Sequence, residues 1–485
     1  MLPGWLWSTL VLSLIGGFVL GTLAFDFVTN AERLTEPMRI IWRALTVLPA
    51  QDSRTSYGAL MIFALTWVMG GVIFTSEQAR RGDFAKRPGD GWLAFILYLL
   101  VSLSTGLSFA LVQASRQAAL MNVQAQTMQD VLNVARQVAN FLLSYYYFIV
   151  FTLITGGLIL FFKVKESPRK IAQPWGVISL LVLMVLVGAV AKQTNLQPIQ
   201  ADIVYKQADP YDRSKQWLVA IEHYDQAIEM VPREDFYYLY LGRAYLEYAS
   251  SLQDPAVREA VMQDTEETLI RAREINPLNT DHSANLARMY RRWADFASEA
   301  ERKGLLLRKS SENYELATML SPQNAILWNE WAMLYYYGLG DFEGFKRTNE
   351  HSLEIDDAFD QTWLVRGDVY RQEGDLEEAI RCYETALELN PRSPQVWRML
   401  GDTYINQQQW EEAIHALTMT VELQPRAKDI WNVHQVLARL FSQIGESEQA
   451  LAQAQAALEK APEDQQAALQ ELVTQIQALE ASGGD

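Results

Sequence analysis

The sequence contains few of the side chains that enzymes use for chemistry. Among 485 residues there are five histidines and one cysteine, Cys382, which excludes an internal disulfide and a multi-cysteine metal site. The histidines lie far apart, without carboxylate or cysteine partners at ligand spacing: His223, His282, His351, His415 and His434. The chain also lacks a phosphate-cradling glycine loop and a nucleophile elbow. We therefore expect no catalytic residue, no metal site and no cofactor.

Positive charge is scarce in the part of the chain that follows residue 200. From 201 to 485 there are 26 basic and 49 acidic residues, a net charge of −23, whereas residues 1–200 carry a net charge of +6. Contacts to nucleic-acid phosphates need a clustered basic face. We therefore expect no nucleic-acid partner for the acidic region.

Long apolar runs fill the first part of the chain. Crossing the hydrocarbon core of a bilayer takes roughly 20 helical residues, and five stretches approach this length, near 5–25, 57–75, 92–113, 141–162 and 174–191. The first has no charged segment before it and no small-residue cleavage site, so we expect a retained helix rather than a signal peptide. None has a charge in its interior, which disfavours an ion-coupled transporter, and scattered serines and threonines do not form the polar face of a channel. We predict a transmembrane domain at 1–192 and a short linker at 193–200.

Cations in the short loops predict the orientation of these spans. The loop at 76–91 and the stretch "KVKESPRK" at 163–170 hold four basic residues each, and five alternating spans put both loops on one side. The opposite loops are longer and hold six basic residues: Arg33, Arg39, Arg43, Arg54, Arg116 and Arg136. Because basic residues in short loops stay inside, we expect a multi-pass protein of the bacterial cytoplasmic membrane, with a cytoplasmic N-terminus and an extracytoplasmic C-terminal part. The amphipathic stretch "EPMRIIWRALTVLP" in the first outer loop is expected to lie along the membrane surface.

An internal repeat begins at Asp360. The chain reads "DQTWLVRGDVYRQEGDLEEAIRCYETALELNPRS", and the next 34 residues are "PQVWRMLGDTYINQQQWEEAIHALTMTVELQPRA". Five residues recur at the same positions: Trp363, Gly367, Tyr370, Ala379 and Pro391 return as Trp397, Gly401, Tyr404, Ala413 and Pro425. This pattern resembles the tetratricopeptide repeat family. The resemblance implies helix pairs in which small residues allow close contact, aromatic residues fill the remaining space and proline ends the second helix.

Extending the register gives seven repeat units across 201–464. They start near 201, 235, 280, 325, 360, 394 and 431, and a capping helix with a flexible tip, "SGGD", is expected at 465–485. The predicted fold is all-α. An N-terminal bundle of five transmembrane helices is followed by a superhelical solenoid of tetratricopeptide units.

The units that start at 235 and 280 are 45 residues long, 11 more than the 34-residue period. Eleven residues make about three helical turns, so they can lengthen a helix pair while its buried face stays in phase. We therefore predict lengthened helix pairs, with loop insertions as the alternative. In the first long unit Asp254 and Pro255 are expected to begin the second helix, and in the second Gly304 is expected to form the turn.

The resemblance also implies which side chains line the concave groove of the solenoid. The family's groove positions select Phe236, Arg243, Glu247, Arg288, Arg291, Arg292, Asn329, Tyr336, Tyr337, Arg398 and Asn406. Apart from Glu247 these are cationic, aromatic or amide side chains, which suit acidic peptides or sugars through bidentate hydrogen bonds and stacking. The alternative is a solvated face whose charges are satisfied within the chain. Chaperone-binding members hold a peptide carboxylate with a lysine and asparagine clamp, whereas this chain has Asp368 and Asp402 at the clamp position, so such a receptor is not expected.

A second resemblance connects the membrane part with the first repeats. "TLAFDFVTN", "TSYGALMIFALTWVMGGVI" and "ADIVYKQADPYDRSKQWLVAIEHYDQAIEMVPREDFYYLYLGRAYLEYA" look like the C-terminal region of bacterial O-antigen ligase or polymerase-like membrane proteins that end in tetratricopeptide repeats. In that family catalysis is attributed to an external loop with arginine and histidine. Residues 1–200 contain no histidine, and the first outer loop offers Arg33, Arg39, Arg43 and Arg54. The chain therefore resembles the scaffold end of such a protein without the catalytic end.

Together these patterns predict a membrane-anchored scaffold rather than an enzyme. We expect the repeats to bind protein partners on their concave face, at the outer side of the cytoplasmic membrane, with the lipid bilayer around the spans. The alternative is a non-catalytic or partial subunit of an O-antigen ligase-like glycan-transfer system, acting with the machinery that assembles polysaccharides.

Overall fold

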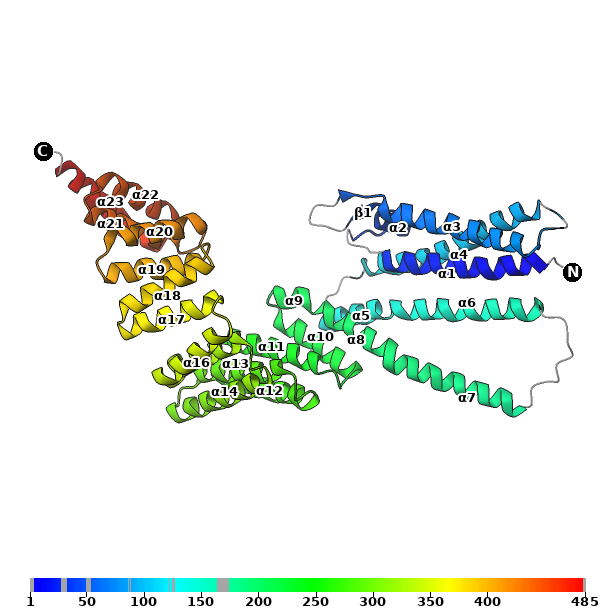
Figure 1. Ribbon diagram of the computed structural model, residues 1–485, viewed down its shortest axis with the longest axis horizontal. Helices are drawn as coiled ribbons and strands as arrows, with labels where there is room; N and C mark the ends of the chain where they lie inside the picture. Colours follow the sequence, from blue (N-terminus) through cyan, green and yellow to red (C-terminus); the bar gives the residue numbers. More distant parts are fainter. Residues whose placement is uncertain are drawn as a thin grey trace. The chain divides into compact units, whose positions relative to one another are not determined.

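The computed structural model describes residues 4–27, 33–48, 54–85, 87, 89–121, 123, 127–163 and 174–482. It divides into two compact units, Met1–Val261 and Met262–Asp485, and Figure 1 shows their helices in chain order. Most of the basic stretch at 163–170 and the predicted tip after Ser482 lie outside the described residues. The predictions made for these two segments stay predictions.

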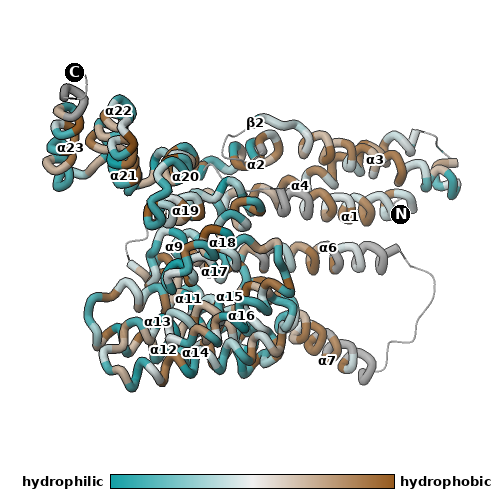
Figure 2. Tube along the Cα trace, turned by 60° about the vertical axis from the view of Figure 1, so that its left-hand side comes forward, coloured by the Kyte–Doolittle hydropathy of each residue, from teal (hydrophilic) through white to brown (hydrophobic). Residues whose placement is uncertain are grey.

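Three helices of the first unit have the length and apolar composition of membrane spans. They are α1 (Gly4–Phe27), α3 (Gly58–Arg80) and α4 (Asp90–Met121), and Figure 2 shows the apolar residues along them. They coincide with the first three predicted spans. The other two predicted spans lie on α6 (Phe141–Lys163) and α7 (Pro174–Ala191), and the count of five spans stays a prediction.

Close contact between α1 and α4 depends on glycine. A Cβ at Gly17 would lie 2.6 Å from the Cβ of Thr105 on α4, and a Cβ at Gly106 would lie 2.8 Å from the Cβ of Leu20 on α1. No side chain fits at either position without moving the partner helix. The backbones of the two helices therefore lie as close together as in the small-residue helix interfaces of membrane bundles.

An amphipathic helix, α2 (Pro37–Thr46), lies between the first two apolar helices in the sequence. It buries Ile40 and Ile41 against the alanines of α4, including Ala110 and Ala114. The opposite side of α2 exposes Trp42. A two-residue antiparallel ladder follows, formed by β1 (Val47–Leu48) and β2 (Arg54–Thr55). The described fold is otherwise helical, in agreement with the predicted all-α class.

The predicted linker at 193–200 is helical. α7 continues into a π-helical segment, η1 (Lys192–Leu196), and then into α8 (Gln197–Gln207). The remaining helices of the first unit are α5 (Met128–Ala139), α9 (Asp209–Arg213), α10 (Trp217–Met230) and α11 (Asp235–Ser251), and α12 (Pro255–Ile275) runs from the first unit into the second. The predicted domain boundaries themselves stay predictions.

The second unit consists of paired helices. The pairs are α13 (Thr280–Phe296) with α14 (Ala300–Leu320), α15 (Ala325–Met333) and η2 (Leu334–Leu339) with α16 (Phe342–Ile355), α17 (Asp360–Glu373) with α18 (Leu376–Leu389), α19 (Pro394–Asn406) with α20 (Trp410–Leu423), and α21 (Ile430–Gln443) with α22 (Ser447–Lys460), followed by α23 (Glu463–Ser482). The first helices begin at or within one residue of the predicted unit starts. The second unit is thus a series of helix pairs (Figure 1).

The pair α17 and α18 shows why this sequence forms a tight helical turn. Gly374 has a φ of 88°, a left-handed conformation that suits glycine, and it ends α17. The side chain of Asp375 then accepts a hydrogen bond from the backbone N–H of Glu378, which caps α18. Inside the pair, Tyr383 is fully buried against the position of Gly367. Turn chemistry and core packing therefore favour the same hairpin.

The long unit that starts at 280 accommodates its additional residues within helices. α13 has 17 residues and α14 has 21, whereas α17 and α18 have 14 each. The prediction that Gly304 forms the turn is wrong, because Gly304 lies inside α14 and the connection is at 297–299. In the preceding unit, Asp254 does cap α12, and its carboxylate accepts a hydrogen bond of 2.8 Å from the backbone N–H of Ala256.

Two glycine substitutions should have opposite effects on the second unit. Gly367→Ala puts a Cβ 2.7 Å from the Tyr383 ring, and this overpacking should cost roughly 1–3 kcal/mol. Gly304→Ala meets only the Arg308 side chain, at 3.7 Å, and the higher helix propensity of alanine should stabilise α14 by up to about 1 kcal/mol. Hydrogen exchange of the detergent-solubilised chain, read from peptides of α14 and α17, measures both changes. Destabilisation by Gly304→Ala would contradict its placement inside a helix.

Candidate partner-binding surface

The predicted groove residues of the first unit lie on α11, where Arg243 is held by its own chain. Its guanidinium donates to the carboxylate of Asp212, which is buried, and lies 5.0 Å from the centre of the Tyr240 ring. Phe236 packs against the same tyrosine, with ring centres 4.6 Å apart. Glu247 lies half-buried on the same helix. Arg243 therefore connects α11 to the preceding repeat.

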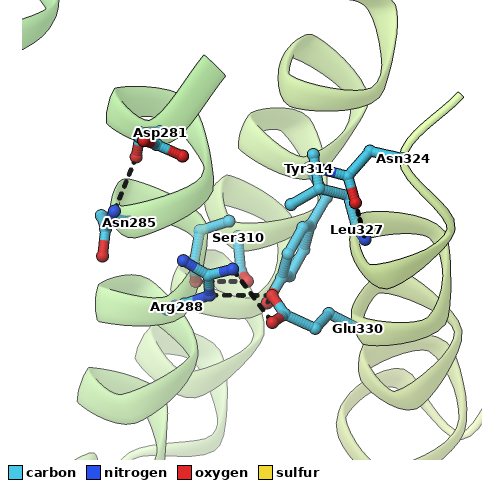
Figure 3. A network of polar contacts seen from close by, with 9 residues as sticks. Asp281, Asn285, Arg288, Ser310, Tyr314, Asn324, Leu327 and Glu330 are labelled. Atoms are coloured by element: carbon cyan, nitrogen blue, oxygen red, sulfur yellow. Dashed lines mark hydrogen bonds and ion pairs between the residues drawn. The ribbon is translucent and has the colours of Figure 1, made fainter. Parts of the chain in front are cut away.

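Arg288 on α13 makes the corresponding connection in the second unit. Its guanidinium donates two hydrogen bonds to Glu330 on α15, at 2.8 and 3.0 Å, and the hydroxyl of Tyr314 donates to the same carboxylate at 3.2 Å. Figure 3 shows the three side chains converging between their helices. Burial lowers the pKa of Arg288, but the hydrogen bonds and charge of Glu330 outweigh it and raise the pKa above its ordinary value. The pair is a charge-assisted, bidentate link between neighbouring repeats.

Two tyrosines of η2 are also bonded to the following repeat. The hydroxyl of Tyr336 donates to Glu373 at 2.8 Å, and that of Tyr337 donates to Asp368. Burial, and then the hydrogen bond and charge of Asp368, raise the pKa of Tyr337. Asp368 also accepts a hydrogen bond of 2.7 Å from Arg371. Its carboxylate thus joins two repeats.

The remaining predicted groove residues differ in their surroundings. Arg398 donates to Asp429 at 2.5 Å. Asn329 is buried, and its Oδ1 has no hydrogen-bond partner among the described residues. Arg291 is half-buried, and Arg292 and Asn406 are exposed. The role of the whole set in partner binding stays a prediction.

Five of the eleven predicted groove residues therefore reach a carboxylate of a neighbouring repeat. For these five the alternative reading of the sequence, charges satisfied within the chain, describes what the structure shows. Sequence reasoning missed the acidic partners: Asp212, Glu330, Asp368, Glu373 and Asp429. The spacing along the sequence could have revealed these partners. In three of the five pairs the two residues are 31 positions apart, and in the pair of Arg288 and Glu330, which includes the long unit, they are 42 positions apart. The difference equals the 11 additional residues of that unit.

The stacked helix pairs define an α-helical repeat protein. More particularly, the chain contains the tetratricopeptide repeat, because the model of that family, described as TPR repeat, matches residues 367–408. No curated protein matches the chain, so the resemblance to O-antigen ligase-like proteins stays a prediction.

Several solved tetratricopeptide structures are similar to parts of the chain. A thermophilic repeat protein of Thermus thermophilus, TTC0263, is 16% identical, covers 42% of this chain and 99% of its own, and has a TM-score of 0.34. A repeat protein of Parabacteroides merdae is 13% identical, covers 57% of this chain and 98% of its own, and has a TM-score of 0.36. YrrB, described as a TPR protein with an unusual peptide-binding site, is 16% identical, covers 42% of this chain and 93% of its own, and has a TM-score of 0.28.

Removing the arginine of the Arg288 and Glu330 pair should destabilise the repeats. Arg288→Ala leaves the carboxylate of Glu330, whose side chain is only 26% exposed, without its cation, and we expect a loss of roughly 1–3 kcal/mol. The matched control is Arg271→Ala, because Arg271 and Glu274 form a pair in which both side chains are more than half exposed; its effect should stay within about 0.5 kcal/mol. Protection of α13 and α15 against hydrogen exchange measures the difference. Equal effects would contradict a structural role for the pair.

The half-buried Asp225 on α10 should make the first repeat sensitive to pH. Burial, and then the charges of Glu222 and Glu229, raise its pKa to about 6. Folding raises this pKa, so the folded chain favours the protonated carboxyl group of Asp225. The contribution of this group to the free energy of unfolding is therefore complete below the ordinary aspartate pKa of about 4 and is lost as the pH rises to about 6. Exchange protection factors of α10 should therefore be higher at pH 5 than at pH 7.5. Asp225→Asn, which cannot ionise, should remove most of that difference, and a difference that persists in the variant would contradict the assignment.

Proposed function

We propose that this chain is a membrane-anchored scaffold whose repeats hold a protein partner at the outer face of a bacterial cytoplasmic membrane. The observation that carries the proposal is the combination, in one chain, of three helices long enough to cross a bilayer and a series of tetratricopeptide helix pairs. Repeats of this kind present extended surfaces to other proteins. The apolar helices then serve to fix that surface to a membrane.

Exposed apolar side chains support the membrane anchor. On α3 the side chains of Met61, Leu65 and Ile73 are each more than 60% exposed. Contiguous apolar surface of this kind is rare on soluble monomers, whereas a bilayer solvates it. Glu77 and Arg80 lie in the last turn of α3 and Arg81 follows it directly, so charge is placed at the end of the apolar stretch. The basic residues Arg80 and Arg81 favour the cytoplasmic side for this end.

The links between repeats support a role in binding. Arg288, Tyr336 and Arg398 each connect their own repeat to the next one. Such links hold neighbouring repeats in a fixed relation, so a partner need not order the surface when it binds. Less conformational entropy is then lost on association. The predicted groove therefore has a rigid frame, with Arg291, Glu247 and Asn406 among the predicted positions that take no part in these links.

Cross-linked capture tests the scaffold function. The tagged full chain is cross-linked in cells, solubilised in detergent and purified with its partners. Arg291→Gln removes one cationic groove position, and if an acidic segment binds there we expect capture of the principal partner to fall about fivefold or more. Arg271→Gln, at an exposed position outside the predicted groove, is the matched control and should leave capture unchanged. Capture that is the same for both variants would contradict binding at the predicted groove.

A further inference from the structure

A pocket of about 730 Å³ lies among α18, α19 and α20. Its apolar walls include Trp397 and Tyr404, and four carboxylates lie around them: Glu384, Glu388, Glu411 and Glu412. The volume falls in the range of small-ligand and side-chain sites in proteins. An aromatic cavity surrounded by several carboxylates is complementary to a cation.

Both aromatic walls are fixed in place by the surrounding chain. The indole N–H of Trp397 donates to the carbonyl of Pro391 at 2.9 Å, and the hydroxyl of Tyr404 donates to Glu384 at 3.0 Å. Each ring therefore keeps its orientation without a ligand. A preformed wall of this kind lowers the entropy that binding costs.

The negative charge of the pocket is not neutralised within the described part of the chain. No basic residue there forms an ion pair with Glu388, Glu411 or Glu412, and the only other titratable base on the pocket wall is His415 of α20. The arginines of α18 and α19 are engaged with other carboxylates. Arg381 pairs with Glu378, and Arg398 pairs with Asp429. Burial, followed by the hydrogen bond of Glu384 and the charge of Glu412, raises the pKa of Tyr404 to about 12, in keeping with an acidic environment around its hydroxyl.

The pocket lies on a different face of α19 from the predicted groove. Trp397, Leu400 and Tyr404 are three and four residues apart, so they share one face of the helix. Asn406 is nine residues beyond Trp397, which corresponds to the opposite side of an α-helix. The pocket and the predicted groove are therefore separate surfaces of the repeats.

We infer that this pocket binds an arginine side chain of a protein partner. A guanidinium is planar, stacks on tryptophan and tyrosine rings, and donates hydrogen bonds in a fork that matches carboxylates. It is also less strongly hydrated than an ammonium group, so it loses less on entering an apolar cavity. This inference rests on the proposed function, because it names the chemistry of a partner that the repeats hold.

The test uses the full chain in nanodiscs and a fluorescent peptide of sequence (Arg-Gly-Ser)₄. Glu411→Gln with Glu412→Gln removes two of the four carboxylates and should weaken peptide binding about tenfold or more, since charge-assisted hydrogen bonds to arginine are lost. The control is Glu448→Gln with Glu459→Gln, at exposed positions of α22. It removes the same net charge outside the pocket and should change the dissociation constant less than about twofold.

Two further measurements decide the chemistry. Trp397→Leu should weaken binding of the arginine peptide more than binding of (Lys-Gly-Ser)₄, because stacking on the indole favours guanidinium. The peptide in which citrulline replaces arginine should not bind. Equal weakening by the two double variants would overturn the inference, because it would show attraction to the acidic chain as a whole, and lysine binding as tight as arginine binding would overturn the choice of arginine.

Failure of the inference and failure of the proposed function give different results. The peptide titration needs only the purified chain, whereas the scaffold function is tested by capture in cells. Peptide binding at the pocket without any captured partner would reject the scaffold and leave the pocket. A captured partner whose binding is unaffected by Glu411→Gln with Glu412→Gln, together with no peptide binding, would reject the pocket and leave the scaffold.

Discussion

The close contact between the two helices of each repeat is the constraint on which the rest of the repeat region depends. At Gly367 the helices approach so closely that a Cβ would lie 2.7 Å from the ring of Tyr383 and 3.2 Å from the carbonyl oxygen of Ala379. Leu364 and Tyr383 belong to one unit, and Val396 and Leu400 of the next unit complete the same buried cluster. A helix pair cannot bury this face alone, so each repeat is stable only with its neighbours.

Charge in the repeats follows from the same stacking. Several cations, such as Arg288 and Arg398, pair with carboxylates of the adjoining repeat. Acidic residues outnumber basic ones in this part of the chain, so many carboxylates have no such partner. Those beside Trp397 and Tyr404 surround an open pocket. Internal pairing therefore leaves an acidic pocket whose charge favours a cationic group, on a surface separate from the predicted groove.

The helix pairs of the repeats could be predicted from the sequence, because the same packing and helix-ending requirements recur from one repeat to the next. The residues of the 34-residue pattern, such as Gly367 and Pro391, mark where helices must touch or end, and helices begin at Asp360 and Pro394 as the pattern requires. Gly304 shows the limit of this reasoning. Glycine marks turns often, but in α14 the surrounding residues continue the helix through it.

The candidate surface was harder to predict, since it depends on pairs of side chains that are distant in the sequence. The position of Arg288 within its repeat indicated the groove, yet only the packed structure places Glu330 beside it, 42 residues away. The pocket between α18, α19 and α20 was not predicted either. Its residues come from two repeats, and a pattern within one repeat cannot reveal a space between three helices.

Cysteine labelling in intact cells tests most directly whether the chain presents its repeats outside a membrane. The single native cysteine, Cys382, is buried, and burial raises the pKa of its thiol to about 12, so it should not react. New cysteines are introduced at the exposed positions Glu463 of α23 and Arg80 of α3. The account predicts that a membrane-impermeant maleimide labels Glu463→Cys at once and labels Arg80→Cys only after the membrane is permeabilised. Labelling of Arg80→Cys in intact cells, with Glu463→Cys protected, would contradict it.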